Sequence, residues 1–227
     1  SEGMTAMTSW LVDLGHASQA FALVAAVWAM VMAVLAIGSR SESMLVSAFR
    51  AVRATALLVG VTAVGLWTAF LTDRFDIEYV FNYSSRDLPL PYKFAAFWGG
   101  QKGSLTLWAL MLAIFSIIVA RPRRGSDASE KLLLGGVASV LMGIMTFFLV
   151  LANFSTDPFE LTKGVTPPDG NGLNPLLQHP AMAIHPPLLY LGFVGMSVPF
   201  AYMASSLLQR RRDDQWIKLS RRPTLLA

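Results

Sequence analysis

Five long apolar runs without a charged residue limit more than any other feature how this chain can fold. A bilayer core about 30 Å thick is crossed by roughly 20 helical residues, each rising about 1.5 Å. Only helices and closed barrels satisfy all backbone polar groups inside lipid. The runs cover residues 17–38, 54–71, 105–120, 132–154 and 186–208, and the third can extend back through residues 94–98. The sequence therefore predicts an all-α, polytopic membrane helix bundle with about five transmembrane helices.

Composition agrees with this fold class. The 227 residues are 54% hydrophobic and 14% charged, whereas a soluble domain has about 25% charged residues. The apolar end of the chain, Leu225–Ala227, resembles the opening of a sixth span. With no break in composition between the spans, residues 1–227 are expected to form a single membrane domain.

The basic residues are distributed unevenly over the connections. Placing the N-terminus outside puts 13 of the 18 Lys and Arg residues in inner segments, at about 39–53, 121–131 and 209–224. They are Arg40, Arg50, Arg53, Arg121, Arg123, Arg124, Lys131, Arg210, Arg211, Arg212, Lys218, Arg221 and Arg222. The positive-inside rule predicts this orientation. The net charge of +4 then orients the chain, and nucleic acid is not expected as a partner.

Several function classes lose support from what the chain lacks. It contains no cysteine, which excludes disulfides, thiolate metal sites and a Cys nucleophile. The five predicted runs hold no Asp, Glu, Lys, Arg or His, and pumps and transporters normally need such groups at membrane depth. The two outer connections, about 72–104 and 155–185, are long and rich in aromatics, Pro and Gly. Long connections are often functional, so we expect the working surface on the outer face.

The first informative segment runs from Trp98 to Trp108, with the sequence WGGQKGSLTLW. Its three glycines and one serine within six residues allow either a positive φ or the close approach of another segment. Tryptophans at both ends suit a membrane interface. By itself this pattern also fits a simple interfacial turn leading into a helix.

The second informative segment carries two of the three histidines, in Leu173–Tyr190 (LNPLLQHPAMAIHPPLLY). A residue before proline avoids the α region and proline suits the first helical turn, so His185 is expected at the outer lip of the fifth span. His179 lies six residues earlier, on the loop. Imidazoles beside an apolar wall can coordinate haem iron, although an interfacial capping histidine is the simpler alternative. His16, near the first span, is expected to be a surface residue.

These two segments, together with the preceding sequence LPLPYKF at residues 88–94, closely resemble the CcmF family. This family is the membrane haem lyase component of cytochrome c maturation. The resemblance covers nearly the whole chain and corresponds to the N-terminal third of that family. It implies that His185 is an axial ligand of a haem b at the outer face. His179, Trp98, Tyr190 and Pro186, from the same motifs, are the other residues expected to bind haem.

The resemblance also implies partners and a compartment. These are haem, apocytochrome c, a haem chaperone with other cytochrome c maturation proteins, the remaining C-terminal part of the lyase, and membrane lipid. The expected location is the bacterial inner membrane with a periplasmic working face, or the mitochondrial inner membrane with an intermembrane one. The whole assembly would form thioether bonds between haem vinyl groups and apocytochrome cysteines.

The chain departs from the family pattern in two respects. The tryptophan-rich haem segment and the second outer histidine ligand of the family lie beyond the part matched here, so this chain alone is not expected to catalyse ligation. The family usually has Glu where Lys102 stands, and we assign Lys102 no role. Two alternatives stay open: a haem-binding membrane subunit of a quinol-linked redox complex, and a non-catalytic membrane scaffold.

Overall fold

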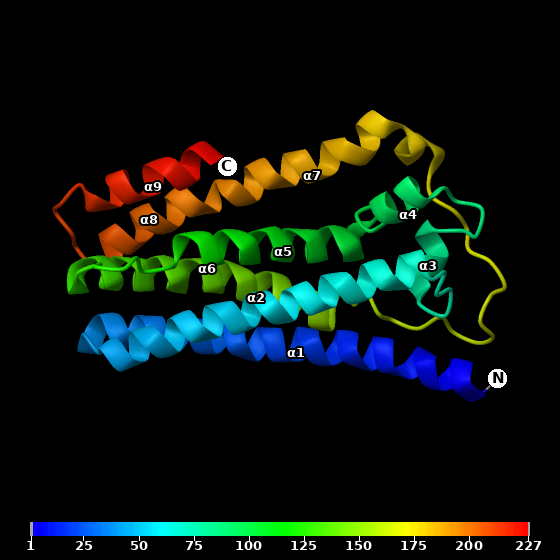
Figure 1. Ribbon diagram of the computed structural model, residues 1–227, viewed down its shortest axis with the longest axis horizontal. Helices are drawn as coiled ribbons and strands as arrows, with labels where there is room; N and C mark the ends of the chain where they lie inside the picture. Colours follow the sequence, from blue (N-terminus) through cyan, green and yellow to red (C-terminus); the bar gives the residue numbers. More distant parts are fainter. Residues whose placement is uncertain (1, 227) are drawn as a thin grey trace.

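The computed structural model describes residues 2–226, with side chains from Trp10 onward except those of residues 222, 223 and 226. Its elements are α1 (Glu2–Ser39), α2 (Glu42–Leu71), α3 (Glu78–Tyr83), α4 (Leu90–Ala96), α5 (Gln101–Val119), α6 (Ala128–Phe154), the short 3₁₀ helix η1 (Pro175–Gln178), α7 (Pro180–Gly195), α8 (Ser197–Leu208) and α9 (Gln215–Leu226). The long helices lie side by side along the long axis (Figure 1). The all-α bundle predicted from the sequence is confirmed.

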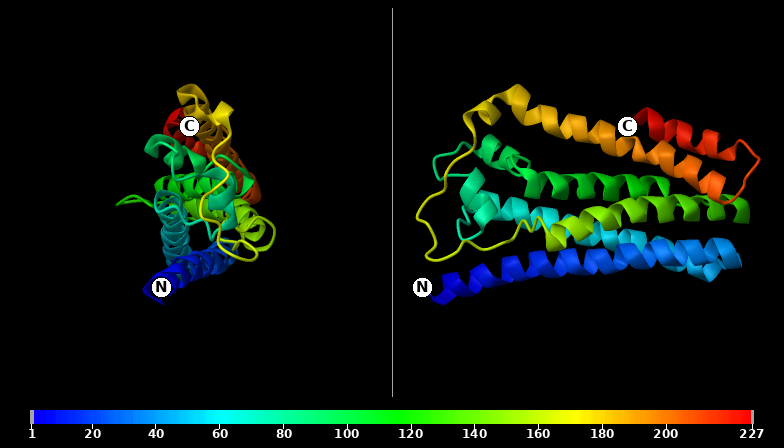
Figure 2. Two further views of the ribbon diagram at one scale, coloured as in Figure 1. Left: turned by 90° about the vertical axis from the view of Figure 1, so that its right-hand side faces the viewer. Right: turned by 180° about the vertical axis from the view of Figure 1, so that it is seen from behind.

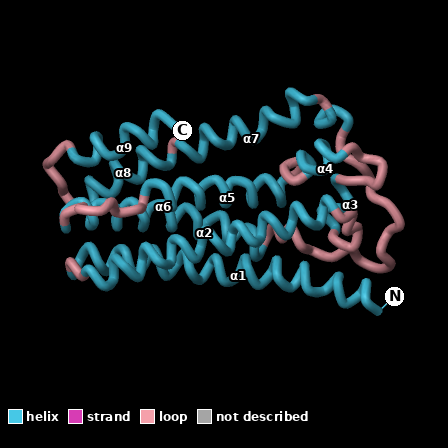
Figure 3. The backbone as a smooth tube through the Cα atoms, viewed as in Figure 1, coloured by secondary structure: helices cyan, strands magenta, loops and turns pink. Residues whose placement is uncertain are grey.

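Within the described residues, five helical stretches are long and apolar enough to cross a membrane. They are Trp10–Ser39, Glu42–Leu71, Gln101–Val119, Ala128–Phe154 and Pro180–Leu208, the last combining α7 and α8. Most of the loops, together with α3 and α4, gather at one end of the bundle, as Figures 2 and 3 show. We call this the capped end, formed by residues 72–100 and 155–179. The opposite end, with the connections 40–41, 120–127 and 209–214, is the basic end.

The helices begin earlier than the apolar runs indicated, and three of these differences matter most. α2 starts at Glu42, where the Ser41 hydroxyl accepts from the Met44 amide, so residues 42–53 are helix and not loop. α7 starts at Pro180, six residues before the predicted start. α9 starts at Gln215, ten residues before the expected sixth span, whose last residue, Ala227, lies outside the described residues. The charged residues next to the spans were predicted to be loops. Helices that extend beyond the membrane surface carry charged residues readily, because the charged ends of these side chains reach water.

The third predicted span was wrong in one respect. It does not extend back through residues 94–98, because α4 ends at Ala96 and a turn separates it from α5. The connection 72–104 is likewise not irregular, since it contains both α3 and α4.

Small side chains decide how closely α1 packs. Its fully buried positions form a stripe of alanines, Ala22, Ala26, Ala29, Ala33 and Ala36. The spacing of three and four residues places them on one helix face. Lipid tails are as apolar as side chains, so membrane helices associate through close van der Waals packing, which small residues permit. α1 accordingly packs on α2 and α6.

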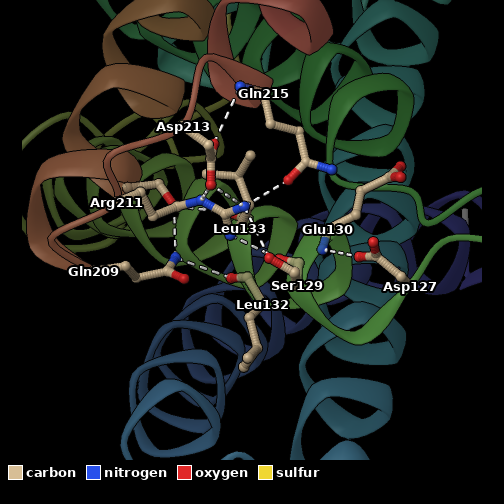
Figure 4. Close-up of polar contacts among 10 residues, drawn as sticks. Asp127, Ser129, Glu130, Leu132, Leu133, Gln209, Arg211, Asp213 and Gln215 are labelled. Atoms are coloured by element: carbon tan, nitrogen blue, oxygen red, sulfur yellow. Dashed lines mark hydrogen bonds and ion pairs between the residues drawn. The ribbon is translucent and has the colours of Figure 1, made fainter.

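The basic end is fastened by polar side chains, drawn in Figure 4. Asp127 caps α6 by accepting from the Glu130 amide at 2.7 Å. Gln209 donates to the Leu132 carbonyl at 3.0 Å. Arg211, whose side chain is 9% exposed, donates to the Ser129 carbonyl at 2.8 Å and pairs with Asp213. The 209–214 connection is therefore held against the start of α6.

The capped end is anchored by one aromatic residue. Phe159 is completely buried, and its ring would lie 2.6 Å from a Cβ atom placed on Gly15 of α1. Leu11 of α1 and Gly65 of α2 belong to the same contact region. Phe159, in the segment after α6, thus fills a gap between α1 and α2. This contact fixes the position of that segment at the capped end.

Candidate functional site

The two loop segments of the capped end are joined to each other. The Glu78 amide donates to the Glu160 carbonyl at 2.9 Å, and the Thr162 amide donates to the Asp76 carbonyl at 2.9 Å. Lys102 Nζ lies 2.9 Å from a Glu78 carboxylate oxygen and 2.6 Å from one of Glu160. Lys102, to which the sequence gave no role, therefore ties α5 to both segments.

The hydrogen bond from Lys102 lowers the pKa of Glu160 below its ordinary value. The pKa of Glu160 is therefore lower in the folded than in the unfolded protein. The ion pair stabilises the fold fully when the pH is above the unfolded value. The contribution is lost as the pH falls through the lowered folded value. At neutral pH this pair therefore adds to the stability of the capped end, by a small amount because the Glu160 side chain is 48% exposed.

A second ion pair holds α4 in place. Lys93 is buried, and its Nζ lies 2.6 and 2.7 Å from the two carboxylate oxygens of Asp73, just beyond the end of α2. Charges removed from water persist only when they are well paired. Just after α4 ends, Trp67 of α2 stacks on Phe97 with ring centroids 4.2 Å apart. α4 is therefore fixed on α2 by charge and by ring stacking.

The turn from Phe97 to Gly100 closes around a tyrosine of α3. The Tyr79 hydroxyl lies 3.0 Å from the Phe97 carbonyl and 3.1 Å from the Gly100 carbonyl, and it accepts from the Gly100 amide at 2.9 Å. Burial raises the pKa of the Tyr79 phenol, so it stays a protonated donor. A Cβ atom on Gly103 would lie 1.7 Å from the Phe97 carbonyl oxygen. Glycine is needed here for close approach and not for a positive φ.

Trp98 connects this turn to α7. Its indole Nε1 donates to the Ala183 carbonyl at 2.9 Å. In a regular helix that carbonyl would accept from the amide four residues later, but residue 187 is proline and has no N–H. Trp98 thus supplies the donor that Pro187 lacks. This bond compensates for Pro187, one of the two prolines, Pro186 and Pro187, that lie inside the helix.

Tyr190, about two helical turns beyond Ala183 along α7, contacts the start of α5. Its hydroxyl lies 3.3 Å from the Ser104 hydroxyl, which donates to the Trp98 carbonyl at 3.1 Å. The Tyr190 ring also lies 5.3 Å from that of Trp108. Two of the predicted site residues, Trp98 and Tyr190, are therefore brought together through Ser104, and both position α7.

An apolar groove of about 620 Å³ lies between α4 and α7. Its lining residues are Pro91, Tyr92, Phe94, Ala95, Trp98, Pro180, Ala183, Ile184, Pro187 and Leu188. The volume is within the range of small-molecule sites. Of the residues predicted from the sequence, only Trp98 lines it, and neither histidine of the segment does.

His185 does not lie at the lip of its helix. It is the sixth residue of α7, and its side chain is exposed. The expectation that His185 marks the start of the helix was wrong, because α7 begins at Pro180 and continues through Pro186 and Pro187. Ala183 and Tyr190 mark the face of α7 that contacts the turn and α5. At 100° per residue, His185 lies on the other side of the helix from Ala183, and Pro186, beside it, is half-buried.

The lip position belongs to His179. It is the N-cap of α7, and its Nδ1 accepts from the Ala181 amide at 3.2 Å. His16 pairs with Asp157 at 2.7 Å, with its side chain 46% exposed, which agrees with the surface role expected for it. The two predicted haem-binding histidines therefore occupy different environments: one caps a helix, and the other is exposed on it.

Sequence inspection missed the bond from Trp98 to Ala183 and the bridge at Lys102. A signal for the first was available. A double proline inside an apolar run leaves carbonyls without donors, and a Trp in another segment is a candidate donor for one of them. No comparable signal marked Lys102, because its partners Glu78 and Glu160 are 24 and 58 residues away in the sequence.

Replacing the Trp98 indole with a phenyl ring, which cannot donate, tests the connection between Trp98 and α7. For Trp98→Phe we expect the free energy of unfolding to fall by about 1 kcal/mol or more, because the Ala183 carbonyl loses its donor. Thermal unfolding in detergent measures this change. Trp108→Phe is the matched control, since the Trp108 indole makes no hydrogen bond within the described residues. Equal losses of stability in the two variants would contradict the assignment.

Fold and site together define the class: an integral membrane helix bundle whose cap fixes a proline-containing helix that presents an exposed histidine. The family model described as cytochrome C assembly protein matches residues 98–226. The chain belongs to this family, and specifically to its CcmF members.

Individual relatives agree with this assignment. The cytochrome c-type biogenesis protein CcmF of Pseudomonas aeruginosa is 43% identical over 159 residues, covering 70% of this chain and 24% of that protein. CcmF of Escherichia coli is 41% identical over 165 residues, covering 71% and 25%. CycK of Rhizobium meliloti is 35% identical over 217 residues, covering 96% and 32%. The chain thus spans about a quarter to a third of their length.

A solved structure of the cytochrome c haem lyase CcmF has the same fold. It superposes with a TM-score of 0.79 at 28% identity, over 95% of this chain and 33% of that one. The resemblance inferred from the two motifs is confirmed. This chain is a membrane protein of cytochrome c biogenesis.

Proposed function

We propose that this chain holds haem at the capped end for covalent attachment to apocytochrome c, with His185 as one axial ligand of the iron. Haem b is the substrate, and it supplies the vinyl groups that the thioether bonds consume. Trp98, Tyr190 and Pro186 act by fixing α7 in position. His179 caps that helix and orients the segment before it.

The observation that carries this proposal is an exposed imidazole on an immobilised helix. Ala181, Leu189 and Gly192 share the helix face of His185, at spacings of four, four and seven residues. A Cβ atom on Gly192 would meet nothing within 4 Å. The imidazole is therefore open to a large planar ligand, while the bonds from Trp98 and Tyr190 keep its backbone fixed.

The surroundings of His185 fit one haem ligand and not a complete site. Within the described residues no group of three His, Cys, Asp or Glu side chains is placed to hold a metal ion. A second ligand would come from another segment, as the relatives' greater length allows. The partners we propose are apocytochrome c, a haem chaperone and the remaining part of the lyase, in a bacterial inner membrane with the capped end in the periplasm.

A visible absorption spectrum tests the proposed function. The protein, purified in detergent, is titrated with haem alone and together with the remaining lyase segments. We expect a haem spectrum that strengthens when the remaining segments supply the second ligand. A bis-histidine spectrum from this chain alone would favour the quinol-linked alternative, and no haem under either condition would favour a scaffold.

Orientation has its own test, since the chain contains no cysteine. A membrane-impermeant thiol reagent added to intact cells should label Thr166→Cys in the capped end and leave Ser126→Cys in the basic end unlabelled. The reason is that the Lys- and Arg-rich connections resist translocation. The reverse pattern would overturn the topology and place His185 at the cytoplasmic side.

A further inference from the structure

Two arginines expected in a loop lie instead on the membrane helix α2. Arg50 and Arg53 are both exposed, and they follow Glu42, the first residue of α2, by eight and eleven residues. At about 1.5 Å per residue they lie about 12 and 16 Å along the helix. Val46 and Leu57, on the same face, are 42% and 70% exposed. The cations therefore interrupt an apolar, outward-facing stripe.

The lengths of two helices place these arginines at one edge of the hydrocarbon core. Counting about 20 residues back from Leu71, the last residue of α2, reaches Ala51. The length of α5 independently locates the same edge of the hydrocarbon core on α2. It starts just after the turn that stacks on Trp67, and its 19 residues span about 28 Å. The same length counted back along α2 from Trp67 ends near Arg50, where the lipid phosphates of the leaflet at the basic end would lie.

Neither guanidinium is neutralised by the described part of the chain. No hydrogen bond or ion pair involves either side chain there. On α2 itself the only carboxylate is Glu42, which is paired with Lys131. Like charges three residues apart on one helix face repel each other. The proximity of Arg50 and Arg53 therefore does not stabilise the fold. An anion bound between them would interact with both guanidiniums.

An apolar furrow of about 440 Å³ begins one turn beyond Arg53. It runs between α1 and α2 and is lined by Trp10, Leu11, Leu14, Ala56, Leu57, Gly60, Val61, Val64, Gly65 and Thr68. From Ala56 to Thr68 it extends about 18 Å along α2. A lipid acyl chain reaches about 15 Å from its ester toward the bilayer centre, half the core thickness. Counted from Arg53, that reach covers the part of the furrow nearest the arginines, from Ala56 past Gly60 and Val61.

We propose that Arg50, Arg53 and this furrow form a binding site for an anionic phospholipid of the leaflet at the basic end. The phosphate is bound by the two guanidiniums, whose planar donor pairs match phosphate oxygens. One acyl chain lies in the furrow, where Gly60 leaves space. A lipid bound there would cover α2 and the adjoining part of α1.

Native mass spectrometry tests the site. The protein is reconstituted with equal amounts of phosphatidylglycerol and phosphatidylcholine, extracted in mild detergent, and its retained lipid is counted. We expect selective retention of phosphatidylglycerol, reduced about tenfold in the Arg50→Gln, Arg53→Gln double variant. The Arg123→Gln, Arg124→Gln variant is the matched control, because it removes the same charge from the exposed loop of the basic end. It should retain the lipid.

Two further arms keep the outcome decisive if the double variant misfolds. Gly60→Leu fills the furrow without changing charge and should lower retention, whereas Gly192→Leu, at an open position on α7, should not. Millimolar inorganic phosphate should fail to displace the lipid. The proposal is overturned by equal retention of the two lipids by the unmodified protein, by equal loss in both arginine variants, or by full displacement with phosphate.

Discussion

Haem content of the reassembled lyase is expected to fall at least about tenfold when His185 is replaced by alanine, and cytochrome c maturation is expected to stop. The estimate is conservative, because residues that only orient a metal ligand are already worth about 10- to 100-fold in metal affinity. His185 is exposed and lies on the opposite side of α7 from Ala183, which accepts the bond from Trp98. The variant should therefore fold normally, with an unchanged thermal midpoint.

His179 offers a control that separates capping from ligation. Its Nδ1 caps α7, and asparagine is among the best N-cap residues. His179→Asn removes the imidazole but keeps a cap, so we expect nearly normal maturation. His179→Ala should cost about 1 kcal/mol of stability and lower maturation only moderately. His16→Ala, which removes only the pair with Asp157, should have little effect.

Chemical rescue adds a test that a structural role for His185 would not pass. In His185→Gly, added imidazole can occupy the vacated space, and it should restore part of the haem absorbance. Full haem content and normal maturation in His185→Ala would show that this histidine is not a ligand.

The second large effect is expected from Gly103→Ala. The new Cβ atom would lie 1.7 Å from the Phe97 carbonyl oxygen and 2.7 Å from the Tyr79 hydroxyl oxygen. A backbone atom cannot rotate away, so the turn itself must open. Forced overpacking typically costs 1 to 3 kcal/mol, and we expect about 3 kcal/mol or more here. Thermal unfolding in detergent measures the loss, and haem content should fall with it because the turn positions Trp98.

Gly100 provides a variant with a built-in compensation. A Cβ atom there would lie 2.3 Å from the Tyr83 ring, which is a side chain that can be shortened. Gly100→Ala should destabilise the protein, and Tyr83→Ala in the same chain should recover part of the loss. Gly192→Ala, with no atom within 4 Å, is the neutral control. Unchanged stability of Gly103→Ala would mean that the turn tolerates a side chain.

The sequence by itself determined the membrane fold, because apolar length is a local property that each span carries alone. The runs centred in α1, α2, α5, α6 and the joined α7 and α8 were identified by length and absence of charge. The family was also accessible, since its two motifs are contiguous stretches around Trp98 and His185. The residues at which the helices begin could not be predicted from the sequence. A charged residue at a membrane surface fits a loop and a helical turn equally well.

Tertiary structure decided the roles of the site residues. His179 and His185 share the same His-Pro context, yet one caps α7 and the other is exposed on it, depending on where the helix begins. That start at Pro180 is compatible with Pro187 only because Trp98, 85 residues earlier, donates to Ala183. Lys102 acquired its role from Glu78, the first residue of α3, and from Glu160, in the segment after α6. Such long-range partners satisfy groups that local sequence leaves open, so only the packed chain reveals them.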